Sequence, residues 1–577
     1  MDTHPNRKLK NDQPSLSIGY IVGGSLKDNL RVRLTVPPQQ VQEGAFVVID
    51  SGEWRFYGLV TDLILGATDP RFADEQSELR LPGELASLLH GQTLYTTLEV
   101  LPPLMRNIGP DPEKPDYVHL KAEWDQKNPN GSPLISIKTI PSHHASVRLA
   151  NEGDIAEIFG KPDDPDNFVI GYTREQNYPV CINLKKFVMR SSGIFGATGT
   201  GKSFLTRLLL SGLIKYNQSS VLVFDMHNEY GFDDTSETNQ KIAGLHSTFG
   251  STRVQIVGLG RTASIRGHSP DFTLEIAERD IATEDVEMLT RELNLKETTP
   301  TTLAGLWHSF HEDWFTEFKA LKVGAIIETE DGKKVPAPDS VAFWANAEGV
   351  NIAAAEGLHN KLNRLFNAKY IVEKTAADSL GEIIRTLQAG RHVVLSFGDF
   401  ESDLDYLLIS NLLTRKIREQ WEKLTNAYRS HPEKNPEPRP LIIAVEEAHK
   451  MLNREMALQT AFSTIAREMR KYYVTLLIID QRPSQIYDEV MSQLGTRISG
   501  WLGDENDIQA VLSGLAGRDA LRGMLARLQP KEEVLLLGWG VPMPIPVHTR
   551  RYDDRFVQEM RGRAAGPRTV ADILKEI

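Results

Sequence analysis

Gly196-Ala-Thr-Gly-Thr-Gly-Lys202-Ser203 is the stretch that decides the fold. It satisfies G-x-x-x-x-G-K-S, a pattern in which glycines let the backbone wrap around a triphosphate and the lysine reaches its β and γ phosphates. Apolar residues at 187–189 and 194–195 precede it, and Leu205, Leu208, Leu209 and Leu213 recur at helical spacing after it. The sequence therefore predicts a strand, a phosphate-binding loop and a helix, in that order.

The loop indicates ATP and Mg²⁺ as cofactors. Lys202 is expected at the phosphates, and the Ser203 hydroxyl is expected to ligate Mg²⁺. The alternative is a glycine-rich turn in an ordinary α/β unit, but both flanks here are those of a phosphate loop. The residues predicted to bind the nucleotide are Thr198, Gly199, Thr200, Gly201, Lys202, Ser203, Phe204, Asp225 and Glu229.

A second apolar strand, 441–445, ends in Glu446-Glu447-Ala-His449. A phosphate loop needs an acidic strand end beside it, so we expect Glu446 to hold Mg²⁺, through water, and Glu447 to orient or deprotonate the attacking water. Most such strands carry Asp first, and Glu is one methylene longer. The alternative is an ordinary strand followed by an acidic helix start.

A third apolar strand, 474–480, ends in Gln481, which is placed to sense the γ-phosphate or the attacking water. The preceding helix has an apolar face at 462, 465, 466 and 469, so its basic residues point elsewhere. Arg467, Arg470 or Arg482 is a candidate to reach a neighbouring subunit's nucleotide. A solvated basic face or an ion pair within the chain is the competing interpretation for each.

The hexapeptide 225–230, DMHNEY, follows another predicted strand. Asp225, His227 and Glu229 alternate as metal ligands can, but such spacing after a strand usually reflects a turn, and no further ligands cluster nearby. A role for Asp225 and Glu229 at the nucleotide site or at a subunit interface is the better prediction.

Composition is that of a globular protein: 577 residues, 40% hydrophobic and 25% charged. The 65 Lys and Arg against 77 Asp and Glu give a net charge of −12, so any DNA-binding surface must be a local basic patch. A single cysteine, Cys181, excludes an internal disulfide and a cysteine-ligated zinc site. With no apolar run of membrane-spanning length and no signal-peptide core at the start, we expect a cytoplasmic protein without membrane contact.

The organisation along the chain predicts an α/β protein with a small N-terminal β-barrel. Short strands at 16–22, 29–36, 45–49, 54–65, 93–101 and 134–140 are separated by turn residues. From about 150, strands at 187–195, 220–225, 254–257, 392–397, 441–445, 475–480, 497–502 and 533–538 alternate with helices, the pattern of a parallel sheet. Residues 264–385 are largely helical and are interpreted as an insertion.

The set GATGTGKS, DMHNEY, VEEAHKML and AREMRKYYVTLLIIDQRPSQI resembles the HerA branch of the HerA/FtsK ATPases, including its bacterial members. The resemblance covers about 150–263 and 380–556. It implies an N-terminal barrel (1–148), a RecA-like P-loop core in two parts (149–263 and 386–556), a helical insertion (264–385) and a C-terminal tail that braces the adjacent subunit (557–577). Glu446 in the Asp-type place, and Met226 and Asn228 in the hexapeptide, depart from the family's pattern.

The resemblance also implies a homo-hexameric ring that translocates double-stranded DNA with a NurA-like nuclease, or that works in antiphage defence with another effector such as a sirtuin-like NAD hydrolase. A second hypothesis is a ring scaffold in which ATP holds such an effector in its active arrangement without processive DNA movement. Stimulation of ATP hydrolysis by duplex DNA, with directional motion, distinguishes the motor from the scaffold.

Overall fold

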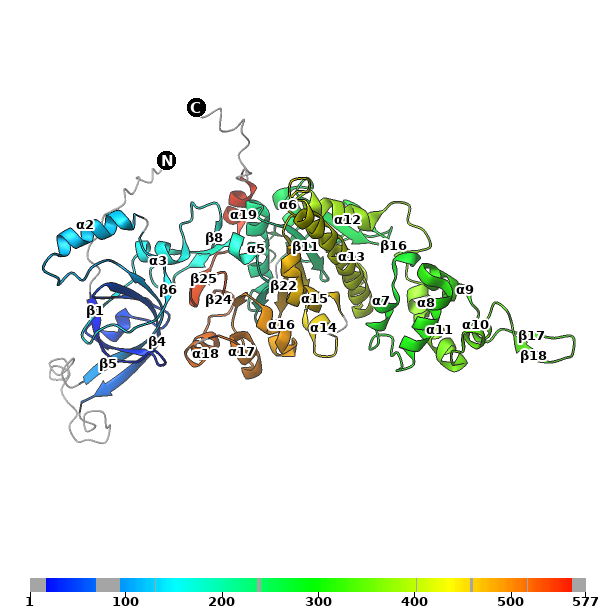
Figure 1. Ribbon diagram of the computed structural model, residues 1–577, viewed down its shortest axis with the longest axis horizontal. Coiled ribbons are helices and arrows are strands. Elements are labelled where there is room, and N and C mark those ends of the chain that lie inside the picture. The colour runs from blue at the N-terminus through cyan, green and yellow to red at the C-terminus, as the bar shows by residue number, and fades with distance from the viewer. Residues whose placement is uncertain are drawn as a thin grey trace, which may run out of the picture. The chain divides into compact units, whose positions relative to one another are not determined.

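The computed structural model describes residues 17–68, 94–129, 131–235, 239, 241–400, 402–456, 460–515 and 517–562. Two compact units emerge: residues 1–183 with 498–550 form the first unit, and 184–497 with 551–577 form the second. The elements of both are labelled in Figure 1. The start of the chain and most of the predicted bracing tail lie outside the described residues, and the domain boundaries at 148, 263, 385 and 556 remain predictions.

The first unit contains the expected N-terminal barrel. Antiparallel strands follow the order β2-β1-β7-β3-β4-β5, and β5 pairs back with β2, which closes the barrel. Alternate side chains such as Val32, Val47, Ile49 and Val100 fill its interior with almost no exposure. The strands are β1 (Ser17–Gly23), β2 (Leu30–Leu34), β3 (Phe46–Ser51), β4 (Trp54–Ala67), β5 (Leu94–Asn107) and β7 (Ser146–Leu149).

The closing strand was not among those expected. The predicted strand 134–140 forms only β6 (Ile135–Ser136), which pairs with β5 outside the closed ring. The closure falls instead to the four-residue β7, which pairs with both β1 and β3. A strand of four residues has too little alternation to stand out in the sequence.

The remainder of the first unit is a small antiparallel sheet in the order β24-β25-β8-β9. β24 (Glu533–Gly538) was expected as a strand of the parallel sheet, but it pairs antiparallel with β25 (Ile545–Thr549). β8 (Asn167–Tyr172), β9 (Pro179–Asn183) and β25 were not expected. β9 begins with proline and β25 contains Pro546, and proline argues against a strand in sequence reading. The helices α2 (Tyr117–Lys127), α3 (Glu152–Phe159), α17 (Glu505–Leu512) and α18 (Arg518–Ala526) also belong to this unit.

The second unit is built on a parallel sheet in the order β15-β14-β20-β11-β21-β22-β10. Its strands are buried along nearly their whole length, as expected for a parallel sheet covered on both faces. The strands are β10 (Ser192–Phe195), β11 (Ser220–Asp225), β14 (Val254–Leu259), β15 (Phe272–Leu274), β20 (His392–Ser396), β21 (Leu441–Glu446) and β22 (Val474–Asp480). β23 (Thr496–Ser499) lies where the chain leaves this unit.

One predicted strand is wrong over half its length. The run 187–195 splits into the short helix α4 (Leu184–Phe187) and the strand β10, which begins only at Ser192. The apolar character of 187–188 reflects burial against the core rather than a strand, since Phe187 and Val188 are both buried. Apolar runs of this length do not distinguish a strand from a buried helix.

Helices flank the sheet of the second unit (Figure 1). The helix α5 (Lys202–Tyr216) packs against β10 and β11 and contacts α19 (Asp554–Arg561). The helix α15 (Ala461–Glu468) packs on β22 and contacts the long helix α13 (Asp403–Ser430). Among the described residues, no helix combines the length and the apolar character that a membrane crossing requires.

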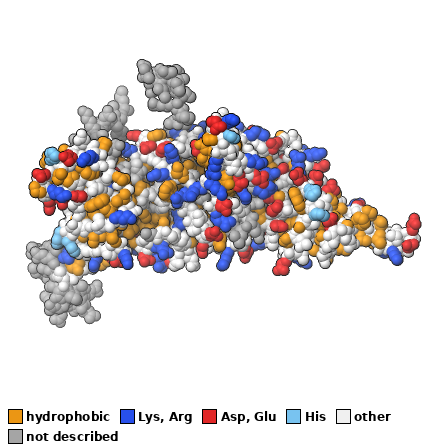
Figure 2. Space-filling model, viewed as in Figure 1, with side chains coloured by type: hydrophobic (Ala, Val, Ile, Leu, Met, Phe, Trp, Pro, Cys, Tyr) orange, Lys and Arg blue, Asp and Glu red, His pale blue; other side chains and the backbone are white. Residues whose placement is uncertain are grey.

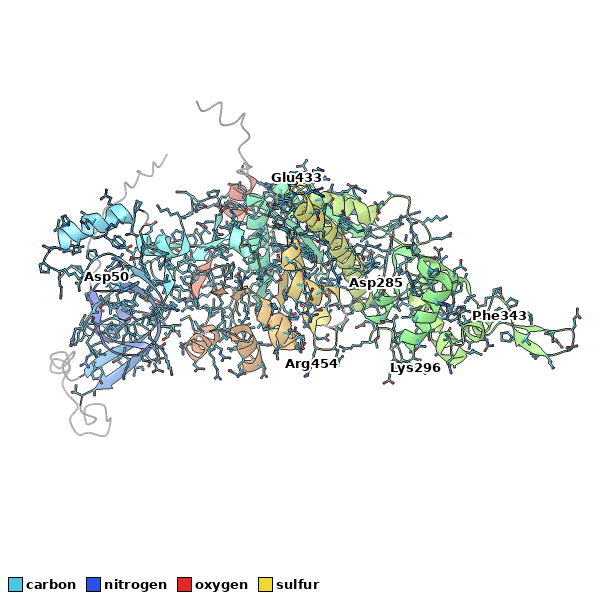
Figure 3. The ribbon with its side chains drawn as sticks, in the orientation of Figure 1. Asp50, Asp285, Lys296, Phe343, Glu433 and Arg454 are labelled. Atoms are coloured by element: carbon cyan, nitrogen blue, oxygen red, sulfur yellow. The ribbon has the colours of Figure 1, made fainter. Side chains whose placement is uncertain are left out.

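Residues between β16 (Ile276–Ala277) and β19 (Ile371–Val372) are mostly helical, as expected. The helices are α7 (Thr283–Glu287), α8 (Thr299–Phe310), α9 (Trp314–Ala320), α10 (Val341–Glu348) and α11 (Ile352–Phe366), and the hairpin β17 (Ile326–Glu328) and β18 (Lys334–Pro336) precedes α10. Hydrophobic side chains, among them Ile326 and Phe343, are exposed in this region (Figures 2 and 3). Buried Asp285 of α7, labelled in Figure 3, pairs with Arg415 of α13 at 2.6 Å.

Candidate nucleotide-binding site

The predicted site residues meet at the carboxyl ends of four neighbouring strands of the second unit. Phe195 of β10 is in register with Asp480 of β22, and Ile479 of β22 is in register with Glu446 of β21. β21 in turn pairs with β11, which ends at Asp225. Because parallel strands end at one edge of a sheet, the segments that follow them converge there, which is where open α/β sheets bind ligands.

The phosphate loop joins β10 to α5. Gly199 and Gly201 have φ angles of 78° and 88°, a region that glycine enters without strain. The Thr200 hydroxyl donates to the Ala197 carbonyl at 2.7 Å and fixes the turn. Helix α5 begins at Lys202, so its amino end faces the loop, as anion binding requires.

Glu446 is 7% exposed, and its two carboxylate oxygens have different surroundings. Oε1 accepts a hydrogen bond of 2.6 Å from the Tyr230 hydroxyl, whereas Oε2 is buried without a partner. Burial raises the pKa of Glu446 well above its ordinary value, the charge of Asp225 adds to the rise, and Lys202 opposes it. The Tyr406 hydroxyl donates to the Glu446 carbonyl at 2.9 Å and holds the backbone at this strand end.

Gln481 joins the phosphate loop to Glu447. Its Oε1 accepts a hydrogen bond of 2.7 Å from the Thr198 hydroxyl, and its Nε2 donates to the two Glu447 carboxylate oxygens at 3.3 and 3.2 Å. Glu447 itself has a φ of 46°, which is unusual for a residue with a side chain. The side chain expected to sense the γ-phosphate thus bridges the two parts of the site.

The hexapeptide 225–230 wraps around Asp225. The carboxylate of Asp225 is fully buried and accepts hydrogen bonds from the amides of Glu229, Tyr230 and Gly231, at 2.7, 2.9 and 3.3 Å. Burial raises its pKa to about 6 despite these three bonds. The Arg207 guanidinium donates to the Glu229 carbonyl, and one oxygen of the Glu229 carboxylate is buried without a partner.

These residues fit a magnesium-bound triphosphate. The Lys202 side chain makes no hydrogen bond or ion pair with any other described residue. The Glu446 Oε2 atom likewise has no hydrogen-bond partner among the described residues. A methyl group added at Gly199 would meet no atom within 4 Å, so the loop backbone is open to a ligand. The Lys202 ammonium group suits the phosphates, and the Ser203 hydroxyl with the free Glu446 oxygen suits Mg²⁺.

Comparison with known proteins finds matches to one family. Residues 168–417 match the family described as "Helicase HerA, central domain". The chain is 23% identical over 488 residues to the DNA double-strand break repair helicase HerA of Saccharolobus solfataricus, with 83% of this chain and 81% of that protein covered. It is also 23% identical over 550 residues to the HerA protein of Sulfolobus acidocaldarius, with 94% of each covered. The chain therefore contains a HerA central domain and is similar to HerA proteins over most of its length.

Solved structures similar to this chain include the bacterial conjugative coupling protein TrwBdeltaN70. Its TM-score is 0.44 at 12% identity, with 70% of this chain and 92% of that chain covered. VirB4 of Thermoanaerobacter pseudethanolicus has a TM-score of 0.42 at 13% identity, with 69% of this chain and 99% of that chain covered. With its HerA central domain and its phosphate loop, the chain is a P-loop ATPase.

Arg467 and Arg470 lie on the exposed side of their helical segment. The predicted apolar face of their helix is buried, and both arginines are exposed. Arg467 lies 3.5 Å from Glu489, and neither arginine contacts the phosphate loop among the described residues. Phe204, 42% exposed, lies at the start of α5 with the Arg207 guanidinium 5.7 Å from its ring. A role for either arginine in a neighbouring subunit's site stays a prediction.

Three residues of the candidate site were not assigned roles from the sequence. Tyr230 and Tyr406 hold Glu446, and His449 binds buried Asp480. Tyr230 and His449 lie inside motifs that the sequence marked, so their position in a motif was the available signal. Nothing in the sequence around Tyr406, in the middle of a helical pattern, indicated a link to β21.

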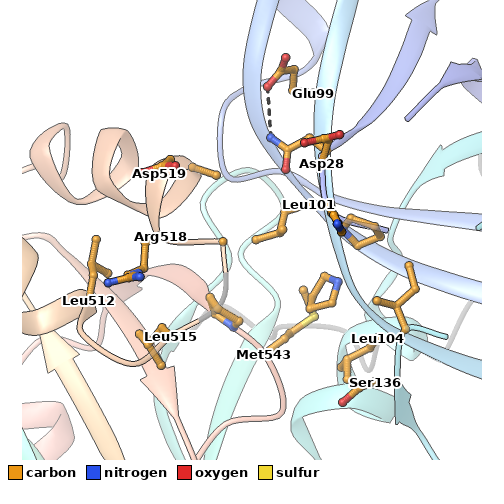
Figure 4. A pocket seen from close by; sticks show the side chains of 18 of the residues that line it. Asp28, Glu99, Leu101, Leu104, Ser136, Leu512, Leu515, Arg518, Asp519 and Met543 are labelled. Atoms are coloured by element: carbon orange, nitrogen blue, oxygen red, sulfur yellow. Dashed lines mark hydrogen bonds between the residues drawn. The ribbon is translucent and has the colours of Figure 1, made fainter. Parts of the chain in front are cut away.

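A cavity of about 1430 Å³ lies within the first unit and contains none of the predicted site residues. Figure 4 shows Leu101 and Leu104 of β5 on one side of it and Arg518 and Asp519 of α18 on the other. Charges of both signs line it, and the phosphate loop belongs to the second unit. This cavity is therefore distinct from the nucleotide site.

Proposed function

We propose that this chain is an ATP-driven motor that assembles as a homo-hexameric ring and moves double-stranded DNA. The observation that carries the proposal is the convergence of the phosphate loop, Glu446 and Glu447, with Gln481 bridging the loop and Glu447. The relatives named DNA double-strand break repair helicase support DNA as the track. The net charge of −12 does not oppose this, because DNA contact needs only a local basic surface.

Each residue has a definite task in the proposed hydrolysis. Lys202 and the amides of 198–203 bind the phosphates, with Gly199 and Gly201 allowing close approach and Phe204 beginning the helix. Ser203 and Glu446 hold Mg²⁺, which supplies charge neutralisation on the phosphates when bound. Glu447 accepts the proton of the attacking water, and Gln481 orients that water. Asp225 and Glu229 shape the adjoining loop.

Subunit and partner assignments follow from the family resemblance. Arg467 or Arg470 completes a neighbouring subunit's site, and the tail 557–577 braces that neighbour. A NurA-like nuclease, or a defence effector such as a sirtuin-like NAD hydrolase, uses the ring's ATP-driven movement in DNA end processing or antiphage defence. We propose that this ATP-driven movement takes place in the cytoplasm.

The test is ATP hydrolysis with and without duplex DNA, together with displacement of a third strand from a triplex substrate, which reports directional movement. The wild-type chain should be stimulated by duplex DNA and should displace the third strand; Lys202→Ala should do neither. Lys322→Ala, which removes an exposed lysine paired with Asp339, is the matched control and should behave as wild type.

ATP hydrolysis that is unaffected by duplex DNA, without strand displacement, would refute the motor proposal. If an effector were then activated by ATP binding alone, the ring scaffold would replace the motor.

A further inference from the structure

Two consecutive residues at the end of β22 contact the turn that follows β21. Gln481 contacts the Glu447 side chain, and the residue before it, Asp480, contacts His449. Asp480 Oδ2 accepts the His449 backbone amide at 2.7 Å and lies 3.0 Å from His449 Nδ1. Because a carboxylate only accepts hydrogen bonds, Nδ1 carries the proton.

Asp480 also fixes its own turn. It is fully buried, and its Oδ1 accepts the amide of Arg482 at 2.7 Å. One carboxylate therefore binds donors from both turns: the turn that carries Glu447 and the turn that carries Gln481. A buried carboxylate is stable only when it is paired in this way, so the geometry of both turns is coupled to one side chain.

The backbone of Glu447 is strained. Glu447 has a φ of 46°, although it is not glycine, and the left-handed region costs an ordinary residue about 1–2 kcal/mol. Such a conformation persists only where the surroundings hold it. The Lys450 amide, which donates to the Glu447 carbonyl at 2.9 Å, and the His449 anchor are the contacts that hold it on the far side of Glu447.

We propose that Asp480 and His449 form a positioning pair that aims the Glu447 carboxylate at the attacking water. The pair acts through the His449 Nδ1 hydrogen bond and the His449 amide, and it keeps Glu447 in its left-handed conformation beside Gln481. His449 Nδ1 lies 3.5 Å from Glu447 Oε2, so the imidazole also limits where that carboxylate can turn. This inference rests on the proposed role of Glu447 as the base.

Two substitutions of His449 separate positioning from bulk structure. His449→Ala removes the side-chain hydrogen bond, and His449→Asn places an amide donor where Nδ1 was. Misplacement of a catalytic group costs about 100-fold per ångström, so we expect the alanine variant to lose about tenfold or more in kcat with unchanged affinity for a fluorescent ATP analogue. The asparagine variant should recover kcat to within about threefold of wild type.

His392 supplies the matched control, since it is another buried histidine of the same sheet, at the amino end of β20. His392→Ala should lower the melting temperature without changing kcat. The inference would be overturned if His449→Ala kept the wild-type kcat, if it lost ATP affinity as much as kcat, or if His449→Asn were no better than alanine. Wild-type hydrolysis by Glu447→Gln would instead refute the proposed base, and the pair's role with it.

Discussion

Tyr230→Phe is the most informative single perturbation, because it removes one hydroxyl and leaves the ring in place. That hydroxyl makes the only hydrogen bond to the Glu446 carboxylate among the described residues, at 2.6 Å. Hydrogen bonds to charged groups contribute about 1.5–3 kcal/mol, and each pKa unit corresponds to about 1.4 kcal/mol. The substitution should therefore raise the pKa of Glu446 further.

The sign follows from which form the bond stabilises. The Tyr230 hydroxyl donates to the charged carboxylate, so its loss favours the protonated form, and Mg²⁺ binds only the charged form. Below the pKa of Glu446 in the wild type, the variant should bind Mg²⁺ about 10- to 100-fold more weakly. Above the pKa of Glu446 in the variant, the two proteins should converge.

The assay is a Mg²⁺ titration of fluorescent ATP binding between about pH 6 and pH 9, in a Glu447→Gln background that prevents turnover. Tyr406→Phe is the matched control, because its equally buried hydroxyl donates to the Glu446 carbonyl and not to the carboxylate. Equal Mg²⁺ affinity in the Tyr230 variant and wild type, a loss that is the same at every pH, or an equal shift in the Tyr406 variant would refute the reasoning.

Two further predictions concern stability. Asp225, whose pKa is raised to about 6 in the folded protein, binds its proton more tightly there than in the unfolded chain, so its contribution to stability is lost as the pH rises towards and through that pKa. The unfolding free energy of wild type relative to Asp225→Asn should fall by about 1 kcal/mol between about pH 5 and pH 7.5 in urea titrations; a constant difference would contradict this pKa. Arg415→Ala leaves the Asp285 carboxyl buried beside Asn411 without its cation, and should lower the unfolding free energy by about 3 kcal/mol, whereas Arg385→Ala, at an exposed pair, should leave it almost unchanged.

Sequence patterns predicted the parts of the site that are local. The phosphate loop and the strand ends at Asp225, Glu446 and Gln481 each follow an apolar run, and parallel strands bring such ends together. The barrel was predictable because turn residues separate its apolar strands, and most of the parallel strands were predictable because they are continuously apolar. Short or proline-containing strands such as β7 and β25 carry neither signal.

Contacts between distant segments account for what the sequence did not reveal. Tyr230 and Glu446 are 216 residues apart, and Tyr406 reaches the same strand end from the middle of α13. Motif spacing cannot tell which carboxylate oxygen is bound and which is left free, although that difference defines the proposed metal ligand. The strained φ of Glu447 is likewise a product of its anchors and not of its residue type.

The most direct measurement of the central claim is the nucleotide retained by Glu447→Gln after incubation with ATP and Mg²⁺ and removal of free ligand. The variant should hold intact ATP and release almost no phosphate, while Glu468→Gln, at an exposed glutamate of α15, should turn over as wild type does. Retention of ADP with wild-type phosphate release by Glu447→Gln would contradict the claim that Glu446, at the end of β21, and Glu447, which follows it, complete the hydrolytic site.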